Sequence, residues 1–121
     1  MDVRKTVGDF GEQLAVTFLE RQGYRIIGRQ VRTRFGEIDI VAETPDLLLF
    51  VEVKTRRTNA YGSPEESITK AKRLHIKRSV ESYRATQHLL AKACRVDALV
   101  ISLDISTHQA HVRQIQNILE E

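Results

Sequence analysis

The chain has 121 residues, of which 41% are hydrophobic and 29% charged, and its formal net charge is +3 at pH 7. These values suit one globular domain over residues 1–121, and no apolar run is long enough to span a bilayer. The start of the sequence is too polar and acidic for a signal peptide, and the single cysteine, Cys94, excludes an internal disulfide. We therefore expect a cytoplasmic protein without a membrane partner.

The basic residues are concentrated in one part of the chain. Between residues 54 and 95 there are eleven Lys or Arg and three Asp or Glu, a net charge of +8. The rest of the chain holds eight basic and thirteen acidic residues. A segment this basic is what a surface that binds a polyanion would carry. The alternative is a solvated helix face whose lysines bind nothing.

The first helix is expected over residues 6–22, where apolar side chains recur at helical spacing before Gly23 ends the pattern. Gly8 and Gly11 inside it each cost about 1 kcal/mol relative to alanine. They therefore predict that another part of the molecule approaches the helix closely. Glu12 lies away from the apolar stripe, and its simplest interpretation is a solvated side chain.

The next elements are expected to be strands. Residues 24–30 predict a strand, and residues 31–36 a basic turn that carries Arg32 and Arg34. Residues 36–57 predict two further strands joined by a tight turn. The register of that hairpin can be read from its turn, because proline prefers the second turn position and aspartate tolerates the third.

The turn of this hairpin lies at residues 44–47, Thr-Pro-Asp-Leu, with Pro and Asp as its two loop residues. Asp39 then lies opposite Glu52, and Glu37 opposite Lys54, with Cβ atoms about 4.5–5.5 Å apart. Like charges placed directly opposite destabilise an antiparallel pair. The register therefore predicts a divalent cation between the two carboxylates, of the kind that oxygen ligands bind, such as Mg²⁺, Mn²⁺ or Ca²⁺.

Lys54 follows Glu52 by two positions, so both side chains point to one face of the strand. The Lys54 ammonium could orient or activate a water, or offset charge that builds on a phosphate. The alternative is an ion-paired surface hairpin in which Lys54 neutralises Glu37. Against this alternative, both faces of the strand are apolar before Glu52, which indicates a central strand.

The clearest helix start in the chain is at residues 63–66, where Ser63 is a good N-cap, proline follows, and Glu66 completes a capping box. This helix should run to about residue 90. One narrow face of it carries four cations at helical spacing, namely Lys70, Arg73, Lys77 and Arg84.

The last part of the chain predicts two more strands. Residues 95–104 read as a strand buried on both faces, and residues 108–115 as an edge strand. The expected order of elements is αβββαββ. This order indicates an α/β fold with a central mixed sheet of about five strands flanked by helices.

Three sequence blocks in order, GEIDIVA, FVEVKTR and YGSPEESI, resemble the YraN-type family of small bacterial proteins. An acidic residue on a first helix, an Asp on one strand and Glu-x-Lys on the next also resemble the PD-(D/E)xK nuclease superfamily. That superfamily includes restriction endonucleases and archaeal Holliday-junction resolvases. The resemblance covers roughly residues 7–115 and implies a restriction-endonuclease-like core. It departs at Ile38, where the superfamily pattern has proline before the aspartate.

The resemblance implies a role for individual residues of this sequence. Asp39 and Glu52 match the two acidic metal ligands, and the Val53 carbonyl would complete the protein ligands. Lys54 matches the catalytic lysine of Glu-x-Lys. Glu12 matches the glutamate on the first helix of resolvase-like members, which can help a second ion or a water. The implied cofactor is Mg²⁺ or Mn²⁺.

The function implied by the resemblance is metal-dependent endonucleolytic hydrolysis of phosphodiester bonds. The substrate would be nucleic acid, DNA rather than RNA, with branched or structured DNA as one candidate. Resolvase-like relatives often act as dimers because two symmetric strands need two sites, so a homodimer is one expected arrangement. The residues expected to contact the nucleic-acid backbone are Arg32, Arg34, Arg56, Arg57, Lys70, Arg73 and Lys77.

Two other classes of function remain open at this point. The chain could be a nucleic-acid-binding adaptor with a vestigial nuclease site, although a pure binder has little use for Lys54 beside two acids. It could also be a structural domain whose acidic residues form salt bridges. Metal titration separates the structural domain from the other two, and cleavage assays separate the nuclease from the adaptor.

Overall fold

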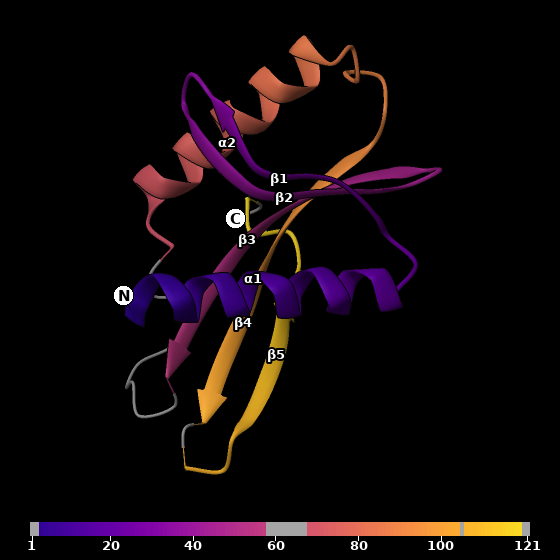
Figure 1. Cartoon of the computed structure of the whole chain (residues 1–121). Coiled ribbons are helices and arrows are strands. Elements are labelled where there is room, and N and C mark those ends of the chain that lie inside the picture. Colours follow the sequence, from indigo (N-terminus) through magenta and orange to yellow (C-terminus); the bar gives the residue numbers. More distant parts are fainter. Residues whose placement is uncertain (1–2, 58–67, 105, 120–121) are drawn as a thin grey trace.

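The computed structural model describes residues 3–57, 68–104 and 106–119 (Figure 1). Its elements follow in the order α1 (Val3–Arg21), β1 (Arg25–Thr33), β2 (Gly36–Thr44), β3 (Leu47–Arg57), α2 (Lys70–Thr86), β4 (Cys94–Asp104) and β5 (Gln109–Ile115). This order and the mixed sheet confirm the predicted fold class and are consistent with a restriction-endonuclease-like core. Within the described residues, no helix is long and apolar enough to cross a membrane.

The five strands form one sheet in the order β1-β2-β3-β4-β5. β3 and β4 run parallel, whereas the other neighbours are antiparallel. A parallel pair needs a crossover connection, and α2 lies in that connection. The predicted edge strand is confirmed, because among the described strands β5 pairs with β4 alone and lies at one end of the sheet.

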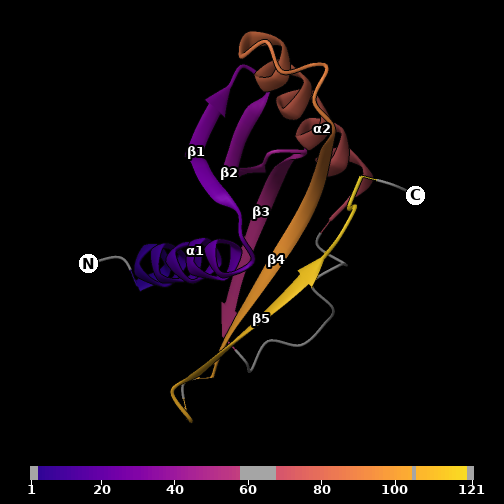
Figure 2. The same ribbon diagram turned by 90° about the vertical axis from the view of Figure 1, so that its right-hand side faces the viewer.

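The two helices cover opposite faces of the sheet, as Figure 2 shows. On the α1 face, Leu19 packs in a buried cluster with Leu49, Leu99 and other strand residues. On the α2 face, Ile76 packs in a second cluster that includes Phe50. β3 and β4 contribute to both clusters, which confirms that they are central strands.

The hairpin of β1 and β2 is longer than the sequence predicted. The turn expected over residues 31–36 is wrong in its first half, because β1 continues to Thr33 and only residues 34–35 connect it to β2. The extension follows from pairing and packing. Val31 pairs with Ile38, and both contact the core cluster on the α2 face.

The predicted register of β2 and β3 is confirmed over five residue pairs, from Thr44 opposite Leu47 to Ile40 opposite Val51. The pairing ends there, one step before Asp39 would face Glu52. The two strands therefore separate at the point where the charged residues begin.

The described helix α2 begins at Lys70. Thr69 is its N-cap, and the Thr69 Oγ1 accepts a hydrogen bond of 3.1 Å from the backbone N–H of Lys72. Such a cap satisfies one of the amide groups left open at a helix start. The capping box predicted at residues 63–66 lies outside the described residues, and the described helix begins at Lys70.

The helix α2 ends earlier than the predicted residue 90. Its last residue is Thr86, and His88 has a positive φ of 58°, a left-handed conformation that ends helices. The Arg84 side chain then donates to the carbonyls of Leu90 and Lys92, at 2.8 and 2.9 Å. Arg84 therefore supports the connection to β4 and is not a free member of the predicted basic face.

Two glycines of α1 predict opposite effects of the same substitution. A Cβ atom at Gly11 would lie 1.9 Å from the Oγ1 of Thr55 on β3, whereas a Cβ at Gly8 would meet nothing within 4 Å. The predicted close approach is therefore confirmed at Gly11 and wrong at Gly8. Gly8→Ala should stabilise the protein by up to about 1 kcal/mol through helix propensity. Gly11→Ala should destabilise it by about 1–3 kcal/mol through overpacking.

Urea unfolding of the two variants beside the wild type measures both effects. Each substitution adds the same methyl group to the same helix, so Gly8→Ala serves as the control for Gly11→Ala. Changes of the same sign in the two variants would contradict the close crossing of α1 over β3.

Candidate active site

Four predicted site residues gather where β2 and β3 separate. Asp39 comes from β2, while Glu52 and Lys54 come from β3. Glu12 comes from α1, which crosses β3 at the contact between Gly11 and Thr55. Their charges act on one another, since Glu12 influences the pKa of Asp39 and Asp39 influences the pKa of Glu52.

The Asp39 carboxylate is held in place by the neighbouring strand. Its Oδ2 accepts a hydrogen bond of 2.8 Å from the backbone N–H of Val53, beyond the last backbone pair of β2 and β3. Burial raises the pKa of Asp39, and the negative charge of Glu12 adds to the rise, whereas the hydrogen bond from Val53 opposes it. A carboxylate therefore occupies the edge of β3 that the backbone of β2 has left.

Glu52 is the most perturbed carboxyl group of the site. Burial, followed by the charge of Asp39, raises the pKa of Glu52 from 4.5 to about 7. The positive charges of Lys72 and Lys54 act in the opposite direction but do not cancel the rise. Without a cation, two ionised carboxylates at this position would repel each other.

Lys72 is a residue of the site that the sequence did not predict. The pKa of Lys54 is lowered first by burial and then by the neighbouring Lys72, whereas the negative charges of Glu52 and Asp39 act in the opposite direction. Lys72 lies in the first turn of α2 and is half-buried. One sequence signal could have placed Lys72 in the first turn of a helix. Thr69 is a good N-cap residue three positions earlier, and its side chain accepts a hydrogen bond from the Lys72 N–H.

Glu12 is not the solvated residue of the simplest interpretation. Only 8% of it is exposed, and its carboxylate accepts hydrogen bonds from the Arg29 Nε at 3.1 Å and the Gln30 Nε2 at 3.0 Å. Gln30 has a positive φ of 48°, which is uncommon for a residue with a side chain. Glu12 is therefore anchored by β1 while its charge still reaches Asp39.

A further buried carboxylate, Asp97 of β4, belongs to the framework. Its oxygens accept both donors of the Arg95 guanidinium at 2.9 Å, the Gln114 Nε2 at 2.8 Å and the Asn117 N–H at 3.1 Å. A fully buried charge is stable only with such partners. Asp97 ties β4 to β5 and to the segment after it.

The residues at the strand separation fit a divalent cation. Among the described residues, no group of three or more His, Cys, Asp or Glu could hold a metal, but the predicted ligands are two carboxylates and a backbone carbonyl. The Val53 N–H faces Asp39, and strand geometry directs the Val53 carbonyl to the same edge. Oxygen donors of this kind suit Mg²⁺ or Mn²⁺, and a cation would relieve the repulsion between Asp39 and Glu52.

The predicted arginine contacts lie at the ends of strands. Arg32 and Arg34 are exposed at the end of the β1–β2 hairpin. Arg32 forms an ion pair of 3.7 Å with Glu37, so Glu37 is paired across β1 and β2. Among the described residues, Lys54 forms no ion pair with Glu37 within 4 Å, which contradicts the alternative in which Lys54 neutralises Glu37. Two further arginines, Arg56 and Arg57, end β3.

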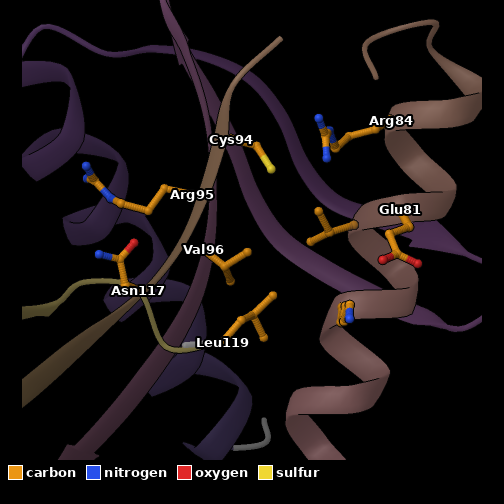
Figure 3. Close-up of a pocket in the computed structure, with 9 residues that line it drawn as sticks. Glu81, Arg84, Cys94, Arg95, Val96, Asn117 and Leu119 are labelled. Atoms are coloured by element: carbon orange, nitrogen blue, oxygen red, sulfur yellow. The ribbon is translucent and has the colours of Figure 1, made fainter. Parts of the chain in front are cut away.

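The predicted lysine stripe lies apart from the acidic residues. Lys70, Arg73 and Lys77 are turned roughly 100–160° around α2 from Lys72, at 3.6 residues per turn. Lys77 lines a groove of about 200 Å³ between α2, β4 and the segment after β5 (Figure 3). Figure 3 also shows Arg95 pointing away from α2, so it does not extend this basic surface.

A family model described as Uncharacterised protein family UPF0102 matches residues 11–101, from α1 into β4. The chain belongs to this family. The UPF0102 match confirms the YraN-type family expected from the sequence blocks. The matched region contains Glu12, Asp39, Glu52, Lys54 and Lys72.

Relatives within UPF0102 are similar over most of their length. The UPF0102 protein of Dehalococcoides mccartyi strain BAV1 is 42% identical over 118 residues, which cover 98% of this chain and 96% of the relative. The Geobacter metallireducens protein is 41% identical over 116 residues, covering 96% and 93%. The Symbiobacterium thermophilum protein is 45% identical over 97 residues, covering 80% and 82%.

Proposed function

We propose that this UPF0102 protein is a metal-dependent endonuclease that hydrolyses phosphodiester bonds, with branched or structured DNA as its substrate. One observation carries the proposal. The separation of β2 and β3 brings Asp39, Glu52 and Lys54 together at one edge of a central strand, with the Val53 backbone facing the same edge. This is the donor set that a divalent cation and a phosphodiester require.

Each residue of the site has a distinct task in this proposal. Asp39, Glu52 and the Val53 carbonyl would hold Mg²⁺ or Mn²⁺, which supplies polarisation of a phosphate oxygen and a lowered pKa of a bound water. Lys54 places an ammonium or amine group on the same strand face as Glu52, where it can offset phosphate charge or accept a proton. Glu12 adds negative charge near Asp39, and Lys72 adds positive charge near Lys54.

The structural alternative lacks the partners it needs. Within residues 3–57, 68–104 and 106–119, neither Asp39 nor Glu52 forms an ion pair with a cation within 4 Å. Their raised pKa values mean that the folded state gains nothing from their negative charges. In the alternative of a nucleic-acid-binding adaptor, the protein would still bind nucleic acid. That alternative does not explain why Lys54 lies beside two acidic residues.

A screen for cleavage tests the proposed function. Four-way junctions, flaps, single strands and duplexes of DNA, with RNA counterparts, are incubated with the protein in Mg²⁺ or Mn²⁺. Asp39→Asn, prepared in the same way, controls for a contaminating nuclease. Cleavage of a branched DNA by the wild type alone supports the proposal. Binding without cleavage of any substrate would favour the adaptor.

Metal binding should appear as a gain in thermal stability. Mn²⁺ at 100 times its Kd should stabilise the native state by about 3 kcal/mol, a rise in Tm on the order of 10 °C. Asp39→Asn should abolish this rise, because it removes one ligand and part of the repulsion that the ion relieves. Asp46→Asn, in the exposed β2–β3 turn, is the matched control and should keep the full response. An equal response in Asp39→Asn would refute the metal site.

The stripe on α2 gives a prediction about salt dependence. If the exposed Lys70 and Lys77 bind phosphates, Lys70→Gln/Lys77→Gln should lower the slope of log affinity against log salt by about 0.7–0.9 for each phosphate that is no longer neutralised. Arg21→Gln, at the end of α1 on the other face of the sheet, is the control. Fluorescence anisotropy in Ca²⁺ over a series of salt concentrations measures the slopes. An unchanged slope would show that the stripe is a solvated helix face.

The oligomeric state and location complete the proposal. A homodimer would supply one site to each of two symmetric strands, and sedimentation velocity with and without a four-way junction tests it. We propose a cytoplasmic location, where a free thiol such as half-buried Cys94 stays reduced.

A further inference from the structure

The tip of the β1–β2 hairpin presents an aromatic ring to solvent. Phe35 is 40% exposed and belongs to neither core cluster. The guanidinium of Arg34 lies 5.4 Å from the centre of its ring, within the range of a cation–π contact. A single exposed ring is common on protein surfaces, so the role of Phe35 must be inferred from its neighbours and its position.

The turn that carries Phe35 is firmly built. The Thr33 Oγ1 accepts a hydrogen bond of 3.1 Å from the Phe35 N–H and donates one of 2.8 Å to the Gly36 carbonyl. Gly36 has a φ of +143°, which glycine adopts without strain. The tip also leans on α2, because a Cβ at Gly36 would lie 3.3 Å from the Ser79 Oγ (Figure 1). The partly exposed ring is therefore carried by a turn with a defined backbone conformation.

The tip lies within reach of the proposed active site along two separate elements. Gly36 and Asp39 are three residues apart on β2, which is about 10 Å along a strand. Ser79 and Lys72 are seven residues apart on α2, which is also about 10 Å along a helix. Figure 1 shows the hairpin tip and the first turns of α1 and α2 toward the same side of the molecule. About three stacked nucleotides would bridge this distance.

We propose that Phe35, backed by Arg34, is a stacking platform for an unpaired base of the nucleic-acid substrate. This inference rests on the proposed function, because it assumes that nucleic acid reaches the site. An aromatic ring with neighbouring arginines is the arrangement that binds single-stranded bases without regard to sequence. The exposed cations Arg32 and Arg34 favour a polyanion over an apolar protein partner. A base held here would place the strand between the tip and Asp39.

The test measures binding in Ca²⁺, so it does not depend on cleavage. The probe is a forked DNA with a single-stranded arm that carries 2-aminopurine, compared with a fully paired duplex. Phe35→Ala should bind the fork on the order of 10-fold more weakly and bind the duplex nearly as well as wild type. Phe35→Trp should restore the affinity, and stacking in the wild type should quench 2-aminopurine fluorescence. Phe10→Ala is the control, since Phe10 is 54% exposed on α1.

The outcomes separate the platform from the function on which it rests. If the wild type binds the fork and Phe35→Ala behaves like Phe10→Ala, the platform is wrong and the nuclease proposal stands. An equal loss of fork and duplex affinity in Phe35→Ala would also overturn the platform, because stacking requires an unpaired base. If the wild type binds no nucleic acid, both proposals fail together.

Discussion

Replacing Lys54 with alanine should slow cleavage at least ~100-fold, the scale of losing one electrostatic stabiliser of a transition state. Metal and nucleic-acid binding should change little, because the group acts on charge that develops during the reaction. Packing should also tolerate the change. The neighbouring Val53 points to the α1 face of the sheet and packs there, whereas Lys54 points to the other face.

Single-turnover cleavage of a branched DNA in Mn²⁺, beside binding in Ca²⁺, measures the effect. Lys54→Arg should rescue poorly, because a planar guanidinium places its charge differently and cannot lose a proton. Arg21→Ala, which removes an exposed cation at the end of α1, is the control and should cleave nearly as fast as wild type. Normal cleavage by Lys54→Ala would show that the active site has been wrongly assigned, even in a protein that is a nuclease.

Glu52→Gln should stabilise the metal-free protein at pH 8 by up to about 3 kcal/mol and change its stability little at pH 4. The folded-state pKa of Glu52 is about 7, above its ordinary 4.5, because burial and the charge of Asp39 disfavour the ionised form. Ionisation therefore costs stability progressively between these two values. The cost is absent below pH 4.5 and complete above pH 7. Glutamine is never ionised, so it avoids this cost.

Urea unfolding in EDTA at pH 4, 6 and 8 tests this prediction, with Glu43→Gln as a control of opposite sign. Hydrogen bonds from Arg25 and then Lys92 lower the pKa of Glu43. Its ionised form therefore stabilises the fold above its ordinary pKa, and that stability is lost as the pH falls. Glu43→Gln should destabilise the protein at pH 8. A Glu52→Gln effect that does not grow with pH would contradict the raised pKa.

The features that the sequence predicted correctly depend on local chemistry. Pro45 and Asp46 specify a two-residue turn, and the turn determines the register of β2 and β3 over five pairs. The apolar runs of β3 and β4 identify central strands, because both of their faces must be buried. The turn and the apolar runs were sufficient to place Asp39 of β2 near Glu52, which lies on the central strand β3.

The features that the sequence missed depend on how elements pack in three dimensions. Glu12 is buried because α1 crosses β3 at Gly11 and because β1 brings Arg29 and Gln30 to its carboxylate. Lys72 reaches Lys54 because the first turn of α2 lies near the point where β2 and β3 separate. Helical periodicity alone does not predict where a helix starts relative to the sheet. The periodic pattern of cations identified a different side of the same helix. Periodicity tells which residues share a face, but not which face meets the site.

The separation of β2 and β3 has a consequence for how this protein can evolve. Five backbone pairs on the core side of the separation fix the position of Asp39, and the described hairpin residues beyond them share no backbone pairs with β3. Substitutions at the exposed tip residues Arg34 and Phe35 can therefore accumulate without moving Asp39, whereas Val31 and Ile38 must keep packing against the core. In the proposed function, the metal ligand Asp39 and the residues that contact the substrate would thus lie on different parts of one hairpin, so natural selection or an engineer could alter the second while leaving the first intact.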